Sequence, residues 1–281
     1  MVDLSEILTD LHEESAELDD LVAGLPAADW RRATPAPGWS IAHQIAHLTS
    51  TDRAAVASAT DPHEFGRWLA AAATDPDGFV GAATERALAE PPELLRRWRA
   101  SRAELAAALT AAPRDARLPW FGTTMSPASA ATARLMETWA HGEDVAVALG
   151  RPRLPTRRLR HVAHLGVRTM AFSFLVHGRP APDAPVFVEL TGPDGGTWAF
   201  GPPDATDRVT GPALDFCLLV TQRAHRDDLG LEATGPVADA WLDVAQAFAG
   251  PPGSGRPPGP RTSPEAGGSP EQDRRPEEAA R

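Results

Sequence analysis

The sequence contains no lysine and no tyrosine, so all 27 of its basic residues are arginine. Without these two residue types, the chain has neither a Schiff-base lysine nor a catalytic tyrosine. The 38 acidic residues outnumber the arginines and give a formal net charge of −11. A chain with this excess of negative charge has no long-range attraction for phosphate backbones or anionic lipid. We therefore expect small-molecule partners, and neither a nucleic-acid partner nor a membrane partner.

Cysteine is nearly absent as well. Cys217 is the single thiol of the 281 residues, so no intramolecular disulfide can form. It lies in an apolar stretch, where a buried and inert thiol is the expectation and a catalytic nucleophile is the alternative. No run of roughly 20 apolar residues suggests a membrane span, and the first residues resemble no secretion signal. These absences predict a cytoplasmic protein.

Apolar residues recur at helical spacing through most of the first 150 residues. Glycine or proline follows each long periodic segment, and Ser40 and Ser126-Pro127 are typical of helix starts. The pattern predicts four principal helices and two shorter ones, at residues 4–22, 41–59, 93–112 and 127–149, and at 61–73 and 76–89. Because no segment in this part has the pattern of a strand, residues 1–150 are expected to form a four-helix bundle.

The pattern changes after residue 150. A helix is expected over 156–177, followed by two strands at 186–190 and 197–200 around a glycine-rich turn, and by a short strand at 208–210. Two more helices are predicted at 212–226 and 236–249, each opening with proline after glycine. Residues 151–250 are therefore predicted to form a small α+β domain. Residues 251–281 are rich in proline and glycine and contain no large apolar side chain, which predicts a disordered tail.

Two histidine-containing pairs occur on the predicted bundle helices. Glu137 and His141 are four residues apart, as are His43 and His47, and this spacing places both side chains of a pair on one face of a helix. Two histidines and one glutamate suit Zn²⁺ and leave a coordination position open. A solvated helix face is the alternative for each pair, and the spacing does not choose between His43 and His47.

The segments that contain these pairs resemble a known family. Residues 37–48 (PGWSIAHQIAHL) and 137–145 (ETWAHGEDV) are similar in order, spacing and separation to the DinB-like metal-binding bundles, and more specifically to the mycothiol-dependent maleylpyruvate isomerase superfamily. The resemblance implies a bundle followed by a small α+β domain. It implies His47, Glu137 and His141 as the metal ligands, with His43 supporting the site or the core.

Residues 221–226 (TQRAHR) and 245–253 (AQAFAGPPG) resemble a less characterised, metal-binding branch of this superfamily. The C-terminal segment departs from that of the true isomerases, so the resemblance does not identify maleylpyruvate as the substrate. It implies Zn²⁺ or another divalent metal, with mycothiol as a thiol cofactor. A metal-held thiolate would add to an electrophilic carbon and leave after bond rotation, or remain as a thiol conjugate. The implied activity is that of an isomerase or transferase.

Two further residues are candidates for catalysis. Asp144 follows His141 by one helical turn and is expected to carry a proton or orient a histidine, with a solvated helix-end acid as the alternative. The resemblance places Arg223 in a region where the family has an arginine. The Arg223 guanidinium could bind a carboxylate of the substrate, or the cofactor, through bidentate hydrogen bonds. The alternative is a surface arginine that pairs with Asp227. His161 and His164 form another close pair, but nothing near them in the sequence completes a site.

Two other functions compete with the thiol-dependent enzyme. In the first, the metal only stabilises the bundle and the second domain binds an apolar ligand. In the second, a metal-bound hydroxide hydrolyses the substrate without a thiol. A structural zinc site is normally closed by four protein ligands, so a site with three favours catalysis.

Overall fold

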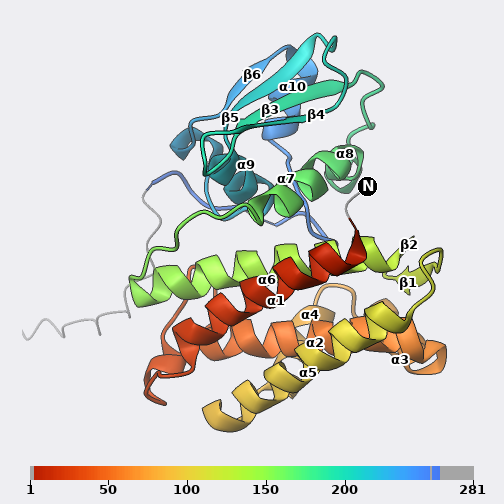
Figure 1. Cartoon of the computed structure of the whole chain (residues 1–281), viewed down its shortest axis with the longest axis vertical. Coiled ribbons are helices and arrows are strands. Elements are labelled where there is room, and N and C mark those ends of the chain that lie inside the picture. The colour runs from red at the N-terminus through yellow and green to blue at the C-terminus, as the bar shows by residue number, and fades with distance from the viewer. Residues whose placement is uncertain (1–2, 254, 260–281) are drawn as a thin grey trace, which may run out of the picture.

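A computed structural model describes residues 3–253 and 255–259. Its first part is a bundle of four long helices, in which α1 and α6 lie side by side and α2 packs against α5 and α6 (Figure 1). The helical segments of this part are α1 (Leu4–Val22), the single turn η1 (Asp29–Arg31), α2 (Ile41–Thr60), α3 (Pro62–Thr74), α4 (Phe79–Ala87), α5 (Pro91–Ala111) and α6 (Pro127–Leu149). The predicted bundle is confirmed.

The ends of α6 follow from its sequence. Ser126 caps its start by accepting a hydrogen bond from the backbone N–H of Ser129, and Pro127 occupies its first turn, where no backbone donor is needed. Gly150 ends the helix with φ 64°, a left-handed conformation that glycine adopts without strain. This long, mostly buried helix carries Glu137 and His141.

One element of the bundle was not predicted. Strands β1 (Leu118–Trp120) and β2 (Thr123–Met125) form an antiparallel hairpin between α5 and α6, and Gly122 takes φ 76° at its turn. Each strand has three residues, which is too short for an alternating pattern to be detected. Trp120 packs there against Phe65 and Phe121.

The second part contains a four-stranded sheet with the order β4-β3-β5-β6. Strands β3 and β5 are parallel, and β4 and β6 pair antiparallel at the two edges. The strands are β3 (Val186–Thr191), β4 (Thr197–Phe200), β5 (Asp207–Pro212) and β6 (Glu232–Thr234). The first three match the predicted strands, whereas β6 was not predicted. The fold class is therefore α+β, as expected, with the bundle preceding the sheet.

Three predicted helices of this part are shorter than expected. Residues 156–177 form two helices, α7 (Leu159–Arg168) and α8 (Met170–Val176), which are separated at Thr169. Helices α9 (Ala213–Val220) and α10 (Pro236–Leu242) end six or seven residues before the predicted ends, and the turn η2 spans Arg226–Asp228. Tertiary hydrogen bonds replace helical ones after these ends, because Ala247 N donates to Val220 O and Gln246 N to Ser173 Oγ.

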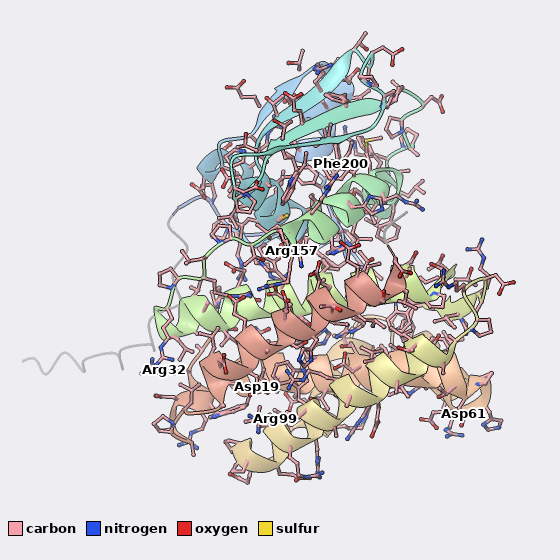
Figure 2. The ribbon with its side chains drawn as sticks, viewed as in Figure 1. Asp19, Arg32, Asp61, Arg99, Arg157 and Phe200 are labelled. Atoms are coloured by element: carbon pink, nitrogen blue, oxygen red, sulfur yellow. The ribbon has the colours of Figure 1, made fainter. Side chains whose placement is uncertain are left out.

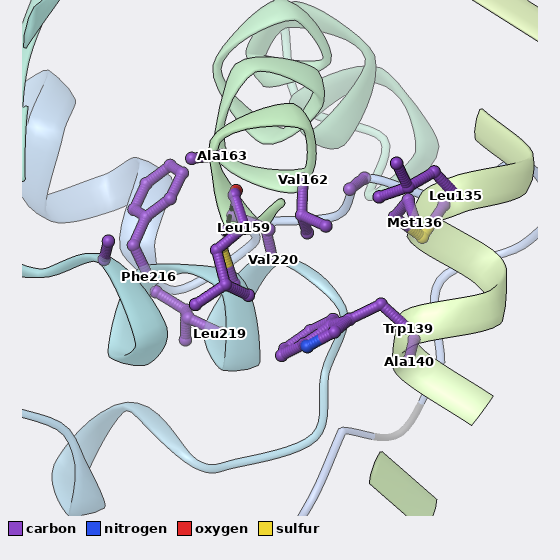
Figure 3. Close-up of a cluster of buried hydrophobic side chains, with 14 of the residues drawn as sticks. Leu135, Met136, Trp139, Ala140, Leu159, Val162, Ala163, Phe216, Leu219 and Val220 are labelled. Carbon is purple, nitrogen blue, oxygen red and sulfur yellow. Dashed lines mark hydrogen bonds between the residues drawn. The ribbon is translucent and has the colours of Figure 1, made fainter. Parts of the chain in front are cut away.

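A continuous hydrophobic core joins the two parts of the fold. Trp139 and Leu135 of α6 face Leu159 and Val162 of α7, and these pack in turn against the buried face of α9 (Figure 3). Cys217 of α9 lies fully buried in this core, and burial raises the pKa of its thiol well above the ordinary value. This agrees with the inert thiol expected from the sequence.

Ion pairs add a second connection between the parts. Arg153 and Arg158, in the segment that follows α6, both bind Glu14 and Glu17 of α1. Glu14 is almost completely buried, so its carboxylate depends on these two arginines for its charge balance. We call these four residues the interdomain ion network.

None of the helices that the structure describes has the length and hydrophobicity of a membrane span.

The predicted tail is described only in its first residues. Arg256 lies against the bundle, where its Nη2 donates a hydrogen bond of 2.8 Å to Asp144 Oδ1. The rest of the predicted tail, residue 254 and residues 260–281, lies outside the described residues. The domain limits at 150 and 250 stay predictions.

Candidate metal centre

Helices α2 and α6 bring three of the predicted site residues together. The Nε2 atoms of His47 and His141 lie 3.3 and 3.1 Å from Glu137 Oε2. One ligand atom from each residue lies within 4.8 Å of the others. Two ligands bound to one zinc ion at about 2.0–2.1 Å in tetrahedral geometry would lie roughly 3.3 Å apart, so these spacings suit a shared ion. Among the described residues, no other three His, Cys, Asp or Glu side chains are grouped in this way.

A buried hydrogen-bond chain orients His141. Its Nδ1 lies within hydrogen-bond distance of Gln44 Oε1, while Gln44 Nε2 donates 2.8 Å to Thr34 Oγ1. Thr34 Oγ1 in turn donates 2.9 Å to the backbone oxygen of Trp39. Because the Gln44 oxygen can only accept, His141 carries its proton on Nδ1 and directs the Nε2 lone pair toward Glu137. A lone pair that faces a carboxylate oxygen calls for a cation between them.

The electrostatics of the cluster agree with this arrangement. Burial, together with the nearby imidazole of His47, lowers the pKa of His141 to about 4, so the ring is neutral at pH 7. Burial alone would raise the pKa of the Glu137 carboxyl, but the contacts with the imidazoles of His141 and His47 outweigh burial and hold this pKa well below its ordinary value. A neutral imidazole and an ionised carboxylate are the forms that bind a divalent metal.

Trp39 forms one wall of the cluster. Its ring centroid lies 5.2 Å from that of His47 and 5.9 Å from that of His141. His43 does not join the cluster, because its Nδ1 meets the Ser40 hydroxyl at 2.7 Å and its Nε2 meets Glu85 at 3.1 Å. The structure therefore separates the two histidines that the sequence spacing could not distinguish: His43 caps the start of α2, whereas His47 faces Glu137.

Asp144 and Arg223 lie next to each other. Asp144 is almost completely buried, and its Oδ2 accepts a 3.0 Å hydrogen bond from Arg223 Nη2, whereas its Oδ1 accepts from Arg256. The alternative of a solvated helix-end acid is therefore wrong, as is the pairing of Arg223 with Asp227. Arg223 also follows the end of α9 instead of lying on a helix. Its Nε is buried without a hydrogen-bond partner in the described part of the chain.

Sequence reasoning missed Gln44 and Arg256. Gln44 is a polar residue at a position of α2 where the helix is fully buried, three residues before His47, and this placement is the signal that could have identified it. Arg256 belongs to a proline- and glycine-rich segment whose composition gives no signal. His161 and His164 do not form a site: His161 Nε2 binds Asp10 at 2.8 Å, and His164 lies beside Phe200.

Comparison with known proteins identifies the family of the chain. A model of the mycothiol maleylpyruvate isomerase N-terminal domain matches residues 11–146, and a model named for wyosine base formation matches residues 182–233. Two uncharacterized proteins from strains of Mycobacterium tuberculosis, Rv0036c and MT0041, are each 55% identical over 257 residues. Each match covers 91% of this chain and all of the relative.

Solved structures resemble the fold as well. The crystal structure of the mycothiol-dependent maleylpyruvate isomerase has a TM-score of 0.54 at 16% identity, and that of its histidine-to-alanine variant has 0.57 at 15% identity. Both comparisons cover 83% of this chain and 93% of the solved one. At this identity the likeness concerns the fold. Together with the bundle match and the close relatives, it shows that the chain belongs to the DinB-like superfamily of the mycothiol-dependent maleylpyruvate isomerases.

Proposed function

We propose that the protein is a divalent-metal enzyme that activates a low-molecular-weight thiol, in the manner of mycothiol, for isomerisation or thiol transfer on a small electrophilic substrate. The observation that carries this proposal is the convergence of His47, Glu137 and His141 from two helices. Three ligands in the described residues leave a tetrahedral ion one position for an exogenous ligand. This donor set suits Zn²⁺.

A divalent ion held there would lower the pKa of a bound thiol or water and stabilise its conjugate base at neutral pH. The protein itself would contribute position and charge. Gln44 fixes the ring of His141, and Trp39 covers the histidines with an aromatic wall. Because Cys217, the single thiol of the chain, is buried in the core, a thiol nucleophile would come from the cofactor.

Arg223 is the proposed binding residue for a carboxylate of the substrate or cofactor. Its guanidinium is near enough to His141 to disfavour the charged form of that ring, and its Nε has no partner among the described residues. Asp144 would act mainly by holding Arg223 in position, because both of its carboxylate oxygens accept hydrogen bonds from arginines.

Cobalt substitution tests the proposal. The protein is loaded with Co²⁺ and its absorption is recorded before and after addition of mycothiol. A thiol-activating enzyme should develop a sulfur-to-cobalt charge-transfer band, and should then convert maleylpyruvate or a related unsaturated acid only when the thiol is present. Metal binding without that band would contradict the thiol mechanism. It would favour a metal-hydroxide hydrolase if an ester or amide is cleaved, and a non-catalytic binding protein if nothing is turned over.

A further inference from the structure

A buried ion pair joins α2 to α6, the two helices that carry the candidate metal ligands. Asp52 Oδ1 accepts a hydrogen bond of 3.0 Å from Arg134 Nε, and only 4% of each side chain is exposed. Asp52 Oδ2 accepts a second hydrogen bond, of 3.2 Å, from Ser101 Oγ of α5. Charged side chains are almost never buried to this extent unless they are paired. None of these three residues takes part in the proposed function, so the pair calls for an explanation of its own.

The ion pair is the last of three side-chain contacts that follow one another along α2 and α6. The contacts are Gln44 with His141, His47 with Glu137, and Asp52 with Arg134. Residue numbers rise along α2 while they fall along α6, so the two helices are antiparallel. The three contacts therefore belong to one axial register, the offset of α2 along α6. A slide of one helical turn, about 5.4 Å, would break them together.

Stability alone does not explain the ion pair. Burial raises the pKa of the Asp52 carboxyl although the charge of Arg134 opposes this, so desolvation of the carboxylate outweighs its attraction to the guanidinium. Arg134 Nη2 is buried and has no hydrogen-bond partner in the described part of the chain, which adds a further cost. Apolar residues of similar volume often stabilise a fold as well as a buried ion pair does, or better. The pair is therefore expected to serve the specificity of packing.

Specific packing is what the metal centre requires of these helices. One ligand, His47, comes from α2, whereas Glu137 and His141 come from α6, so the spacing of the ligands depends on the axial register. The hydrophobic effect is non-directional and does not by itself select one register. A hydrogen-bonded ion pair does select, because it forms only at donor–acceptor distances of about 2.7–3.2 Å. Arg134 precedes Glu137 by three residues, so the pair acts within one turn of the ligands.

We propose that Asp52 and Arg134 are positioning residues for the metal centre, which set the axial register of α2 against α6 and so bring the three ligands together. Ser101 holds the second oxygen of Asp52 and thereby fixes the orientation of the carboxylate. The inference rests on the proposed function for the identity of the bound group. The register itself does not depend on a metal, because the hydrogen bond between Gln44 and His141 also bridges the two helices.

An apolar replacement of the pair separates positioning from stability. The double variant Asp52→Leu with Arg134→Met should keep a Tm close to that of the wild type or above it, whereas its Kd for Co²⁺ should rise by about tenfold or more. The matched control is Asp19→Leu with Arg99→Met, the same replacement at an ion pair between α1 and α5, which should leave the Kd unchanged. Arg134→Lys keeps a charge within reach of Asp52 and should retain most of the affinity. Thermal unfolding and competition with a chromophoric chelator measure the two quantities.

A metal-free measurement distinguishes failure of this inference from failure of the proposed function. In the metal-free protein, the Nδ1 proton that His141 donates to Gln44 should give a downfield NMR signal that is absent from Gln44→Leu. The apolar double variant should lose or shift this signal, and the control should keep it. If the wild type binds no metal, the proposed function fails, but this signal still tests the register.

The inference would be overturned if the apolar double variant keeps the Nδ1 signal of the wild type, or binds Co²⁺ as tightly as the wild type does. An equal loss of affinity in the control would also contradict it, because the effect would not be specific to α2 and α6. The same holds if Arg134→Lys loses as much affinity as the double variant. A double variant that does not fold would make the pair a source of stability, which is equally contrary to the inference.

Discussion

Gln44 determines which nitrogen of His141 carries a proton, and through it the direction of the lone pair in the candidate metal centre. The amide is fully buried between Thr34 and His141, so its two ends are fixed by their neighbours. The four-residue spacing of the metal-ligand pairs does not include this residue, and its only sequence signal is a polar side chain on a buried stretch of α2. The spacing predicted two candidate pairs and the family resemblance chose His47, Glu137 and His141 as ligands, whereas the position of Gln44 depends on how α2 packs against the 34–39 loop.

At the residue scale, Gln44→Leu should weaken metal binding about 10–100-fold, because changes to the partners of metal ligands typically have effects of this size. The ring of His141 would lose its acceptor and with it the preference for Nδ1 protonation. Competition with a chromophoric chelator measures the affinity. Gln44→Glu keeps an acceptor at the same position and should retain most of the affinity. Unchanged affinity in Gln44→Leu would show that Gln44 does not orient His141.

At the scale of elements, Asp19 connects α1 to α5 through ion pairs with Arg99 and Arg102. Its carboxylate accepts from Arg99 at 2.6 and 2.9 Å and from Arg102 at 2.7 Å, and the side chains of Asp19 and Arg99 meet between the two helices (Figure 2). The hydrogen bonds from Arg99, followed by the charge of Arg102, lower the pKa of Asp19 below its usual 3.8. Arg102 also stacks on the Trp98 ring at 4.1 Å.

This lowered pKa predicts a pH-dependent effect of Asp19→Asn. A carboxyl group whose pKa is lowered in the folded protein stabilises the fold at pH values above its ordinary pKa. This stabilisation is lost as the pH falls through the lowered pKa of the folded protein. The variant should therefore be about 1–3 kcal/mol less stable than the wild type at pH 7, and this difference should shrink below about pH 4. Urea denaturation across this range measures it. Asp20→Asn, an exposed neighbour, is the control; a difference that persists at low pH would contradict the assignment.

The secondary structure could be predicted where elements are long and amphipathic. The long helices of the bundle and the strands β3 and β4 followed from periodicity and from proline and glycine at their ends. Strand β6 could not be predicted, because its three residues become a strand only through pairing with β5. Helix α9 stops at Val220 although the sequence continues with helix-compatible residues. The stop comes from the left-handed Gln222, around which the N–H groups of Gln222 and Arg223 donate back to Leu219 O and Leu218 O.

At the scale of the whole molecule, the interdomain ion network and the shared core hold the bundle and the α+β part together. Glu14→Gln would leave Arg153 and Arg158 buried with incomplete charge balance. Breaking a buried pair by removing one partner typically costs about 3–5 kcal/mol, so a fall of several degrees in Tm is expected by calorimetry. Glu13 is an exposed partner of Arg158, with 3.4 Å between Oε2 and Nη1. Glu13→Gln should therefore change the free energy of unfolding by only about 0–1 kcal/mol. Equal effects of both variants would contradict the role of Glu14.

The carboxylate of Asp144 connects the bundle to the second part of the fold. Asp144 lies on α6 of the bundle but binds Arg223 and Arg256, which come from segments that follow α9 and α10. The sequence identified Asp144 and Arg223 as candidates, yet it could not indicate that they meet, because they are 79 residues apart. Their contact depends on the docking of the second part onto the bundle.

Elemental analysis of matched histidine variants tests the central claim most directly. His47 and His43 occur one turn apart on α2, but only His47 faces Glu137. The wild type and His43→Ala should therefore bind about one equivalent of divalent metal, whereas His47→Ala should lose most of it while keeping the helical circular dichroism of the wild type. A wild type without metal, or equal metal loss in the two folded variants, would contradict the proposed centre.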